Sequence, residues 1–260
     1  MSELISSYSP LLEGWLPGPL LRALRQPEPA PDALAEACAR LEAACARVEP
    51  FAPAPVVSRL AAAPLPYERI AGAYLSGTVL VAEIAGLVAL STRLAAGGRQ
   101  GDEAASAVVS RLLATLIAAV HAHGGGVVKA GGDSLMAFFD ERTLGEAHAA
   151  QACAAGLAMQ AHMAALELPR EAEAAPLRLR VAAHSGRVLA VEVGDQTHTE
   201  LLVTGHTISR VARALLGAAP GEVIVTDKLL QHVEGADAPL KLAGQHLLRA
   251  LAAPPPPPPP

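Results

Sequence analysis

The chain has 260 residues, of which 52% are hydrophobic and only 3% aromatic, so its core must consist mainly of Ala, Leu and Val. A net charge of −5 without a dense Lys/Arg run argues against a nucleic-acid partner. The three cysteines form no CxxC pair, which favours reduced, buried thiols in the cytoplasm over disulfides or a zinc site. We predict neither a signal peptide nor a membrane span, because no uninterrupted apolar run reaches about 18 residues.

Three regions follow from composition. Residues 1–66 are predicted to be a helical, proline-rich N-terminal segment and linker, with one helix over residues 31–48. Residues 67–251 carry the alternating strands and helices of a folded domain. Residues 252–260 end in seven prolines and are expected to form a polyproline II tether.

The predicted elements of the domain follow a regular order. They are a strand (78–84), helices (88–96 and 102–121, the second capped by Asp102), a hairpin (127–139), a helix (144–166), strands (177–185, 188–193 and 200–204), a helix (207–216) and a strand (223–226). The break between the strands 177–185 and 188–193 is placed at Gly186 and Arg187. This β-α-β-β-α-β order predicts an α+β, ferredoxin-like antiparallel sheet with the helices on one face.

The hairpin carries Lys129 and, at the tip of a Gly-Gly-Asp turn, Asp133. In the predicted fold the end of the first strand, which carries Glu83, lies beside this turn. Two converging carboxylates are suitable ligands for magnesium. Alternatively, Asp133 only favours the turn and Glu83 is a solvated charge. His184, within an apolar strand, is interpreted as a packed core histidine.

Five blocks resemble the class III adenylate and guanylate cyclase catalytic domain. In this sequence the first block contains Glu-Ile-x-Gly, the second Lys-x-x-Gly-Asp and the third Arg-x-Ala-x-His-x-Gly. The fourth contains Gly-His-Thr-Ile-Ser-x-x-Ala-Arg, and the fifth is a closing strand. The blocks are residues 81–91, 128–138, 180–188, 205–213 and 220–226. The N-terminal segment also resembles, more loosely, the region preceding such domains in large bacterial cyclase–ATPase–repeat proteins.

The resemblance implies a metal-binding half of a cyclase site. Glu83, in place of the usual aspartate, and Asp133 would hold two Mg²⁺ or Mn²⁺ ions. The backbone around Gly86 and Leu87 would bind phosphates, and Lys129 would contact the purine of ATP or GTP.

The other half of the implied site is altered. Leu202 stands where an Asp or Thr reads the base, and Ser209 stands where an asparagine orients the ribose. Arg213, which would stabilise charge on the transferring phosphate, is present. In the family these residues come from the opposite subunit, so the resemblance implies a homodimer or a heterodimer with a second cyclase-like domain.

Two functions remain open at this point. One is a cyclase that makes a cyclic nucleotide and pyrophosphate, with low activity alone. The other is an inactive cyclase-homology module that senses a nucleotide or mediates dimerisation within a larger signalling protein.

Overall fold

A computed structural model describes residues 12–49, 52–53, 56–57, 60, 71–166, 177–194 and 199–259. The chain divides into two compact units, residues 1–53 and 54–260. The boundary expected between residues 66 and 67 lies outside the described residues.

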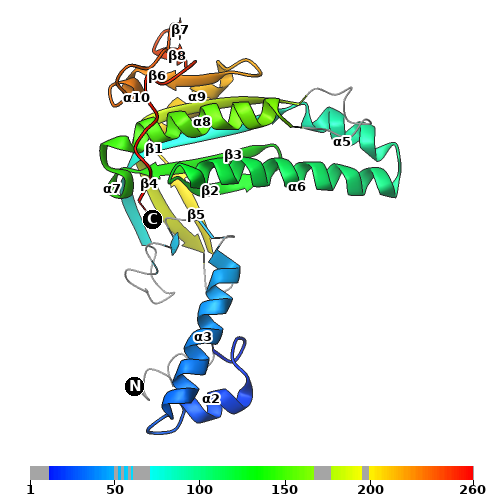
Figure 1. Cartoon of the computed structure of the whole chain (residues 1–260), viewed down its shortest axis with the longest axis vertical. Helices are drawn as coiled ribbons and strands as arrows, with labels where there is room; N and C mark the ends of the chain where they lie inside the picture. The colour runs from blue at the N-terminus through cyan, green and yellow to red at the C-terminus, as the bar shows by residue number, and fades with distance from the viewer. Residues whose placement is uncertain are drawn as a thin grey trace. The chain divides into compact units, whose positions relative to one another are not determined.

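The described part of the N-terminal unit contains the helices α2 (Gly18–Leu24) and α3 (Pro31–Val48) (Figure 1). The bounds of α3 are those predicted. The two helices share a small core formed by Leu16, Leu20, Leu21, Leu24 and Ala37. Cys38 and Cys45 are exposed, so the prediction of three buried cysteines holds only for Cys153. The reason is that α3 buries one narrow strip against the short α2 and leaves its remaining surface to solvent.

The second unit is built on one eight-stranded sheet. Its strands are β1 (Ala71–Ala85), β2 (Gly126–Gly131), β3 (Ser134–Asp140), β4 (Arg178–Gly194), β5 (Thr199–Thr204), β6 (Val223–Thr226), β7 (Leu240–Leu242) and β8 (Gln245–Leu247). The path β2-β3-β1-β4 is antiparallel throughout, as in the predicted ferredoxin-like fold. Beyond this core, β5 pairs with the end of β4, and β6 joins β4 in parallel.

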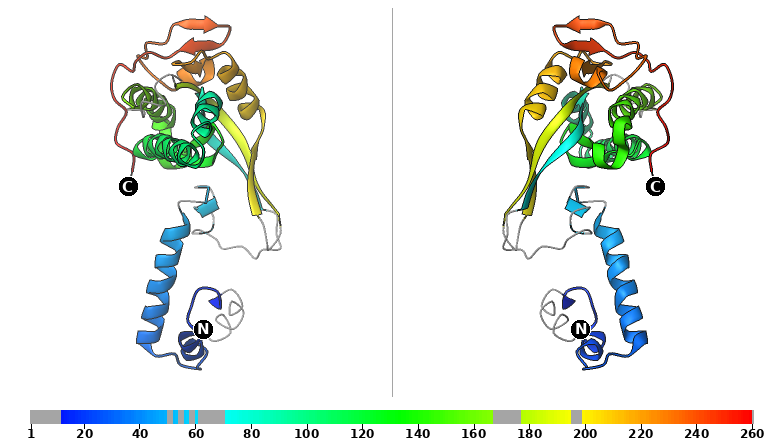
Figure 2. Two further views of the ribbon diagram at one scale, coloured as in Figure 1. Left: turned by 90° about the vertical axis from the view of Figure 1, so that its right-hand side faces the viewer. Right: turned by 90° about the vertical axis from the view of Figure 1, so that its left-hand side faces the viewer.

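Helices cover the sheet in two layers (Figure 2). They are α5 (Leu87–Ala95), α6 (Arg99–Ala122), α7 (Glu141–Leu144), α8 (His148–Ala164), α9 (His206–Leu216) and α10 (Asp227–Leu230). The helices α6 and α8 close the larger apolar core on one face. The helix α9 covers a smaller apolar layer on the opposite face. The predicted fold class is therefore confirmed, with α6 and α8 on one face of the sheet. The helix predicted over residues 207–216 is α9, and it covers the opposite face.

Several predicted boundaries were wrong. The strands 177–185 and 188–193 are one continuous strand, β4, because Gly186 and Arg187 pair with β1 without interruption. The helix α6 begins at Arg99 after Gly98, so Asp102 lies in its first turn and is not the N-cap. The helix predicted over residues 144–166 begins only at His148, after the short α7.

The helix α6 and the proline run concern two predictions, the absence of a membrane span and the proline tether. By length and composition alone, α6 is long and apolar enough to cross a membrane. It also packs Leu112, Leu116 and Val120 into the core beneath it. The proline run contacts the domain, because the side-chain amide of Gln151 donates a hydrogen bond to the carbonyl oxygen of Pro256.

Candidate functional site

Glu83 and Asp133 lie next to each other at one end of the sheet. In the ladder between β1 and β3, Glu83 is paired with Ser134, the residue that follows Asp133. The next residue of β1, Ile84, donates its amide N–H to the carbonyl oxygen of Asp133 at 2.7 Å. The backbone that carries Asp133 is thus fixed against the end of β1, as the predicted fold requires.

The turn that presents Asp133 is tight. Gly132 has φ 62°, a left-handed conformation that strains residues with a Cβ. The turn leaves Asp133 exposed at its tip. An exposed carboxylate on a short hairpin held by two strands is a well-positioned ligand for a hard cation.

The side chain of Glu83 lies on the α9 face of the sheet. Along β1, Leu80 and Ala82 pack into the core beneath α6 and α8, whereas Val79 and Val81 belong to the layer beneath α9. Because successive strand residues alternate between faces, Glu83 shares the face of Val81. The carboxylate therefore lies on the face that α6 and α8 leave uncovered.

Arg180 forms a salt bridge with Glu83 across the β1–β4 ladder, where the two residues are paired. Both side chains are 27% exposed, so water only partly screens the pair. The Nε atom of Arg180 is buried and has no hydrogen-bond partner among the described residues. A divalent ion that binds Glu83 must compete with this guanidinium or share the carboxylate with it.

Directly after Glu83, the chain turns into α5. Gly86 adopts φ 94° and is the N-cap of α5, with no side-chain cap in this part of the structure. The first-turn amides and the positive end of the helix dipole therefore begin three residues after Glu83, at the exposed Gly86, without a side-chain cap. Such a helix start can bind phosphate oxygens.

Lys129 lies on β2, two strands from β1. It is exposed and paired with Met136, which packs into the layer on the α9 face. Cross-strand partners share a face, so Lys129 lies on the same face of the sheet as Glu83.

The structure places Leu202, Ser209 and Arg213 on β5 and α9. Ser209 and Arg213 are exposed and one helical turn apart, so they share a face of α9. Leu202 pairs with Val191 and is 52% exposed. Whether these residues meet a nucleotide together with Lys129 stays a prediction.

The donor chemistry at the end of β1 fits magnesium or manganese. No group of three or more His, Cys, Asp or Glu side chains clusters as a metal site among the described residues. Magnesium is commonly held by one or two carboxylates, with water and substrate phosphates completing its shell. Glu83 and Asp133 can supply these one or two protein carboxylates.

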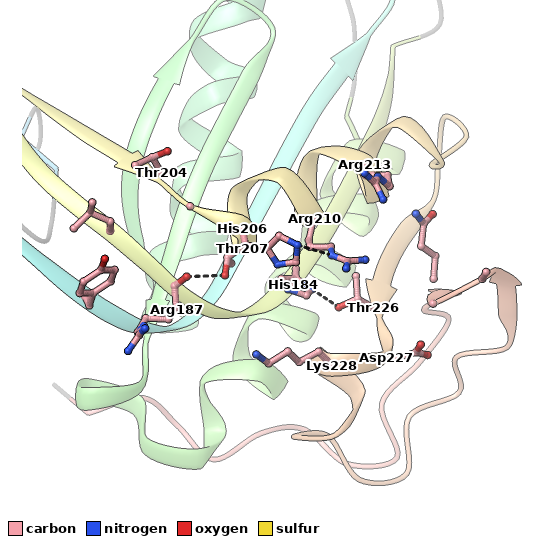
Figure 3. Close-up of a pocket in the computed structure, with 16 residues that line it drawn as sticks. His184, Arg187, Thr204, His206, Thr207, Arg210, Arg213, Thr226, Asp227 and Lys228 are labelled. Atoms are coloured by element: carbon pink, nitrogen blue, oxygen red, sulfur yellow. Dashed lines mark hydrogen bonds between the residues drawn. The ribbon is translucent and has the colours of Figure 1, made fainter.

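A pocket of about 830 Å³ lies along α9 (Figure 3). Residues from β4, α10 and the turn between β7 and β8 complete its walls. We call it the basic pocket, after its basic lining residues His184, Arg187, His206, Arg210, Arg213 and Lys228. Its lining includes Arg213 but neither Glu83 nor Asp133.

Sequence reasoning gave no role to Arg180 or to most of the basic pocket. Arg180 occurs in a recognised block, but its contact with Glu83 depends on the β1–β4 register. The cations of the pocket come from separate elements, so no run of Lys and Arg marks them in the sequence.

Comparison with known proteins gives one family match and many structural ones. The family model described as "Adenylate and Guanylate cyclase catalytic domain" matches residues 73–250. No curated protein matches the sequence.

Solved structures share the fold. The adenylyl cyclase CyaB from P. aeruginosa is 17% identical, with a TM-score of 0.58 over 71% of this chain and 98% of that one. The guanylate cyclase domain of RhGC from Catenaria anguillulae, solved with GTP, is 18% identical, with a TM-score of 0.57 over 69% and 99%. A dimeric guanylyl cyclase domain from Blastocladiella emersonii is 15% identical, with a TM-score of 0.60 over 71% and 100%.

Proposed function

Because the chain belongs to the family of adenylate and guanylate cyclase catalytic domains, we propose that it forms part of a nucleotidyl cyclase. Its substrate would be ATP or GTP, and its products a cyclic nucleotide and pyrophosphate. The observation that carries this proposal is the adjacency of Glu83 and Asp133 at the end of β1, beside the start of α5. We place the protein in cytoplasmic cyclic-nucleotide signalling.

In this proposal, Glu83 and Asp133 hold two Mg²⁺ or Mn²⁺ ions. When bound, such ions neutralise the triphosphate and make the ribose 3′-hydroxyl a better nucleophile. The backbone amides at Gly86 and Leu87 bind phosphate oxygens at the start of α5. Arg180, already in contact with Glu83, adds a positive charge at the same edge.

The purine and ribose contacts come from the other half of the site. Lys129 donates a hydrogen bond to the base. Leu202 can only make apolar contact with it, and a base group buried without its partner loses about 1–3 kcal/mol. Ser209 is too short to orient the ribose as an amide would, and Arg213 stabilises charge on the transferring phosphate.

The arrangement requires a second chain. The exposed face of α9 with Ser209 and Arg213 is available to a partner. We propose a homodimer, or a heterodimer with a second cyclase-like domain. In this dimer the end of the sheet that carries Glu83 and Asp133 in one chain faces α9 of the other.

A second candidate is a regulatory cyclase-homology module that binds a nucleotide without turning it over. It is favoured by Leu202 and Ser209, which weaken base and ribose contacts. The salt bridge from Arg180 also favours it, because it occupies a proposed metal ligand.

A cyclase assay on the purified chain tests the two candidates. Activity is measured with ATP or GTP and with Mg²⁺ or Mn²⁺ over a range of protein concentrations, beside a nucleotide-binding titration. We expect weak activity whose rate per chain rises with concentration, since a monomer has only half of each site. Asp133→Ala should abolish activity, and Asp102→Ala, an exposed acid on α6, should not.

Two results would contradict the cyclase proposal. One is the absence of activity under every condition, with metal-dependent nucleotide binding retained; this result supports the regulatory module. The other is equal activity in Asp133→Ala and in the unmodified chain, which would exclude the proposed metal site at Glu83 and Asp133.

A further inference from the structure

We propose that the surface formed by Gly124, Leu144 and Gln151 is a docking site for a polyproline II helix, and that it holds the chain's own prolines over residues 254–259. We call it the proline-docking surface. Leu144 belongs to the core beneath α6 and α8, away from α9. In both views of Figure 2 the C-terminal segment, in red, runs along the outer side of the green helices. The inference does not rest on cyclase activity.

The first argument is the pattern of burial along the prolines. Consecutive prolines form a polyproline II helix with three residues per turn, so every third residue lies on the same face. Pro255 and Pro258 are half-buried, whereas the other prolines in the range 254–259 are exposed. The spacing of three means that one face of the helix lies on the domain and the other two face solvent.

The second argument is a hydrogen bond to the proline backbone. A polyproline II helix has no internal hydrogen bonds, so its carbonyl oxygens are free to accept from a partner. The side-chain amide of Gln151 donates to the carbonyl oxygen of Pro256, and Gln151 is only 2% exposed. A buried amide that loses its partner destabilises the structure. Gln151 therefore favours the state in which the prolines are docked.

The third argument is the space that Gly124 leaves for Pro258. A Cβ atom at Gly124 would lie 2.7 Å from Cβ of Pro258 and 2.7 Å from Cδ2 of Leu144. Both distances are shorter than a van der Waals contact between carbon atoms. Glycine at position 124 thus lets the ring of Pro258 approach the backbone beside Leu144, as polyproline-binding surfaces require close contact with the proline rings.

The chain just before the prolines is anchored to the same domain. The amide of Asp237 donates to the carbonyl oxygen of Ala250 at 2.9 Å, and the amide of Arg249 donates to the carbonyl oxygen of Asp237 at 2.8 Å. Leu251 then packs against the core. So short a connection between Leu251 and Pro255 gives the chain's own prolines a high effective concentration at the surface. They are therefore favoured over the prolines of a second copy.

The test compares two pairs of substitutions in the full chain by ¹H–¹⁵N NMR spectroscopy. Pro255→Asp with Pro258→Asp changes the face that lies on the domain. Pro254→Asp with Pro257→Asp makes the same change in charge and proline content on exposed positions, and is the matched control.

We expect only the first pair to move the resonances of the Gln151 side-chain amide and the Gly124 backbone amide. The side-chain amide of Gln160 is the internal reference, because it donates to the carbonyl oxygens of Leu179 and Glu222 instead. It should stay in place in both variants.

A synthetic peptide with the sequence of residues 251–260 tests the chemistry of the surface. It should bind the chain that carries Pro255→Asp and Pro258→Asp, and return the two resonances towards their positions in the unmodified chain. The unmodified chain should bind the peptide at least about tenfold more weakly, because its own prolines compete for the surface.

Further substitutions in the Pro255→Asp, Pro258→Asp chain locate the peptide. Gln151→Met removes the donor at similar length and should weaken binding about fivefold. Gly124→Ala should weaken it at least about tenfold, by blocking the proline ring. Gly98→Ala is the control, because Gly98 has a similar φ of 66° and no described atom within 4 Å of an added Cβ. Circular dichroism verifies that each variant is folded.

Three results would overturn the inference. The first is an equal shift of the Gln151 amide in both pairs of proline variants, or none in either. The second is failure of the peptide to bind the Pro255→Asp, Pro258→Asp chain. The third is a position of the Gln151 resonance that changes with protein concentration in the unmodified chain, which would show that a second copy supplies the prolines.

Discussion

The guanidinium of Arg180 contacts the carboxylate of Glu83 from the adjacent strand, so the proposed metal ligand already has a cationic partner. A partly exposed salt bridge of this kind contributes about 1 kcal/mol. An ion that binds Glu83 has to overcome that contribution and the repulsion of the nearby positive charge.

Arg180→Gln should therefore tighten Mn²⁺ binding in the absence of nucleotide, by about fivefold. The matched control is Arg178→Gln, which removes an exposed arginine two residues away on the same strand. Titration followed by electron paramagnetic resonance measures free Mn²⁺ directly. Unchanged or weaker binding in Arg180→Gln would show that the salt bridge does not compete with the ion.

The double replacement Leu202→Asp with Ser209→Asn should raise cyclase activity by at least about tenfold. It restores a hydrogen bond to the base and an amide that positions the ribose, and positional losses alone can reach roughly 100-fold. Leu240→Asp, at another exposed leucine, on β7, serves as the control. If the unmodified chain already turns over ATP or GTP at a rate usual for cyclases, the interpretation that Leu202 and Ser209 impair the site is wrong.

Thr78→Val should lower the free energy of unfolding by about 2 kcal/mol, because the buried side chains of His148 and Ser185 would each lose a hydrogen-bond partner. The hydroxyl of Thr78 is hydrogen bonded to Nδ1 of His148 at 2.8 Å and to Oγ of Ser185 at 2.7 Å, all within the core. Thr115→Val removes an exposed hydroxyl on α6 and should change stability by less than about 0.5 kcal/mol. Chemical denaturation measures both, and equal effects would contradict the prediction.

The chain should lose stability as the pH falls from about 6.5 towards 4, in part because of His184. The folded pKa of His184 is lowered from 6.5 to about 4, by burial first and then by neighbouring cations. Between these values the unfolded chain binds a proton that the folded chain does not, so acid favours unfolding. Above pH 6.5 His184 is neutral in both the folded and the unfolded chain, so this loss of stability is absent there.

His184→Gln should flatten this dependence in denaturation curves recorded at several pH values. Some slope should remain, because burial also lowers the pKa of His148. His162→Gln, in the last turn of α8, should leave the curve as it is. If stability depends on pH with the same slope in His184→Gln and in the unmodified chain, His184 is excluded as a source of that dependence.

Local patterns were sufficient to predict most elements and the adjacency of Glu83 and Asp133. The alternation of strands and helices fixes the ferredoxin-like order, and that order brings the end of β1 to the β2–β3 turn. Gly186 misled the prediction because glycine commonly interrupts a strand. In the structure a Cβ at Gly186 would overlap the hydroxyl of Thr207, which donates to the carbonyl oxygen of Arg187.

The exact register between distant strands, and the places where distant helices and turns meet, were beyond prediction. The contact of Arg180 with Glu83 depends on a register that spans the whole of β1 and β4. The basic pocket depends on where α9, α10 and the β7–β8 turn meet, which no local pattern specifies. The exposure of Cys38 and Cys45 depends on how little of α3 the short α2 covers.

The strand that carries Glu83 is continuous from Ala71, and it is paired with β4 over its full length. Fourteen residue steps at about 3.3 Å each give a stiff ribbon about 46 Å long. Glu83 occupies one end of that ribbon, and Ala71 occupies the other. The β1–β4 register runs from one end to the other without a bulge, so the backbone that carries the carboxylate and the backbone at Ala71 belong to one uninterrupted hydrogen-bonded ladder.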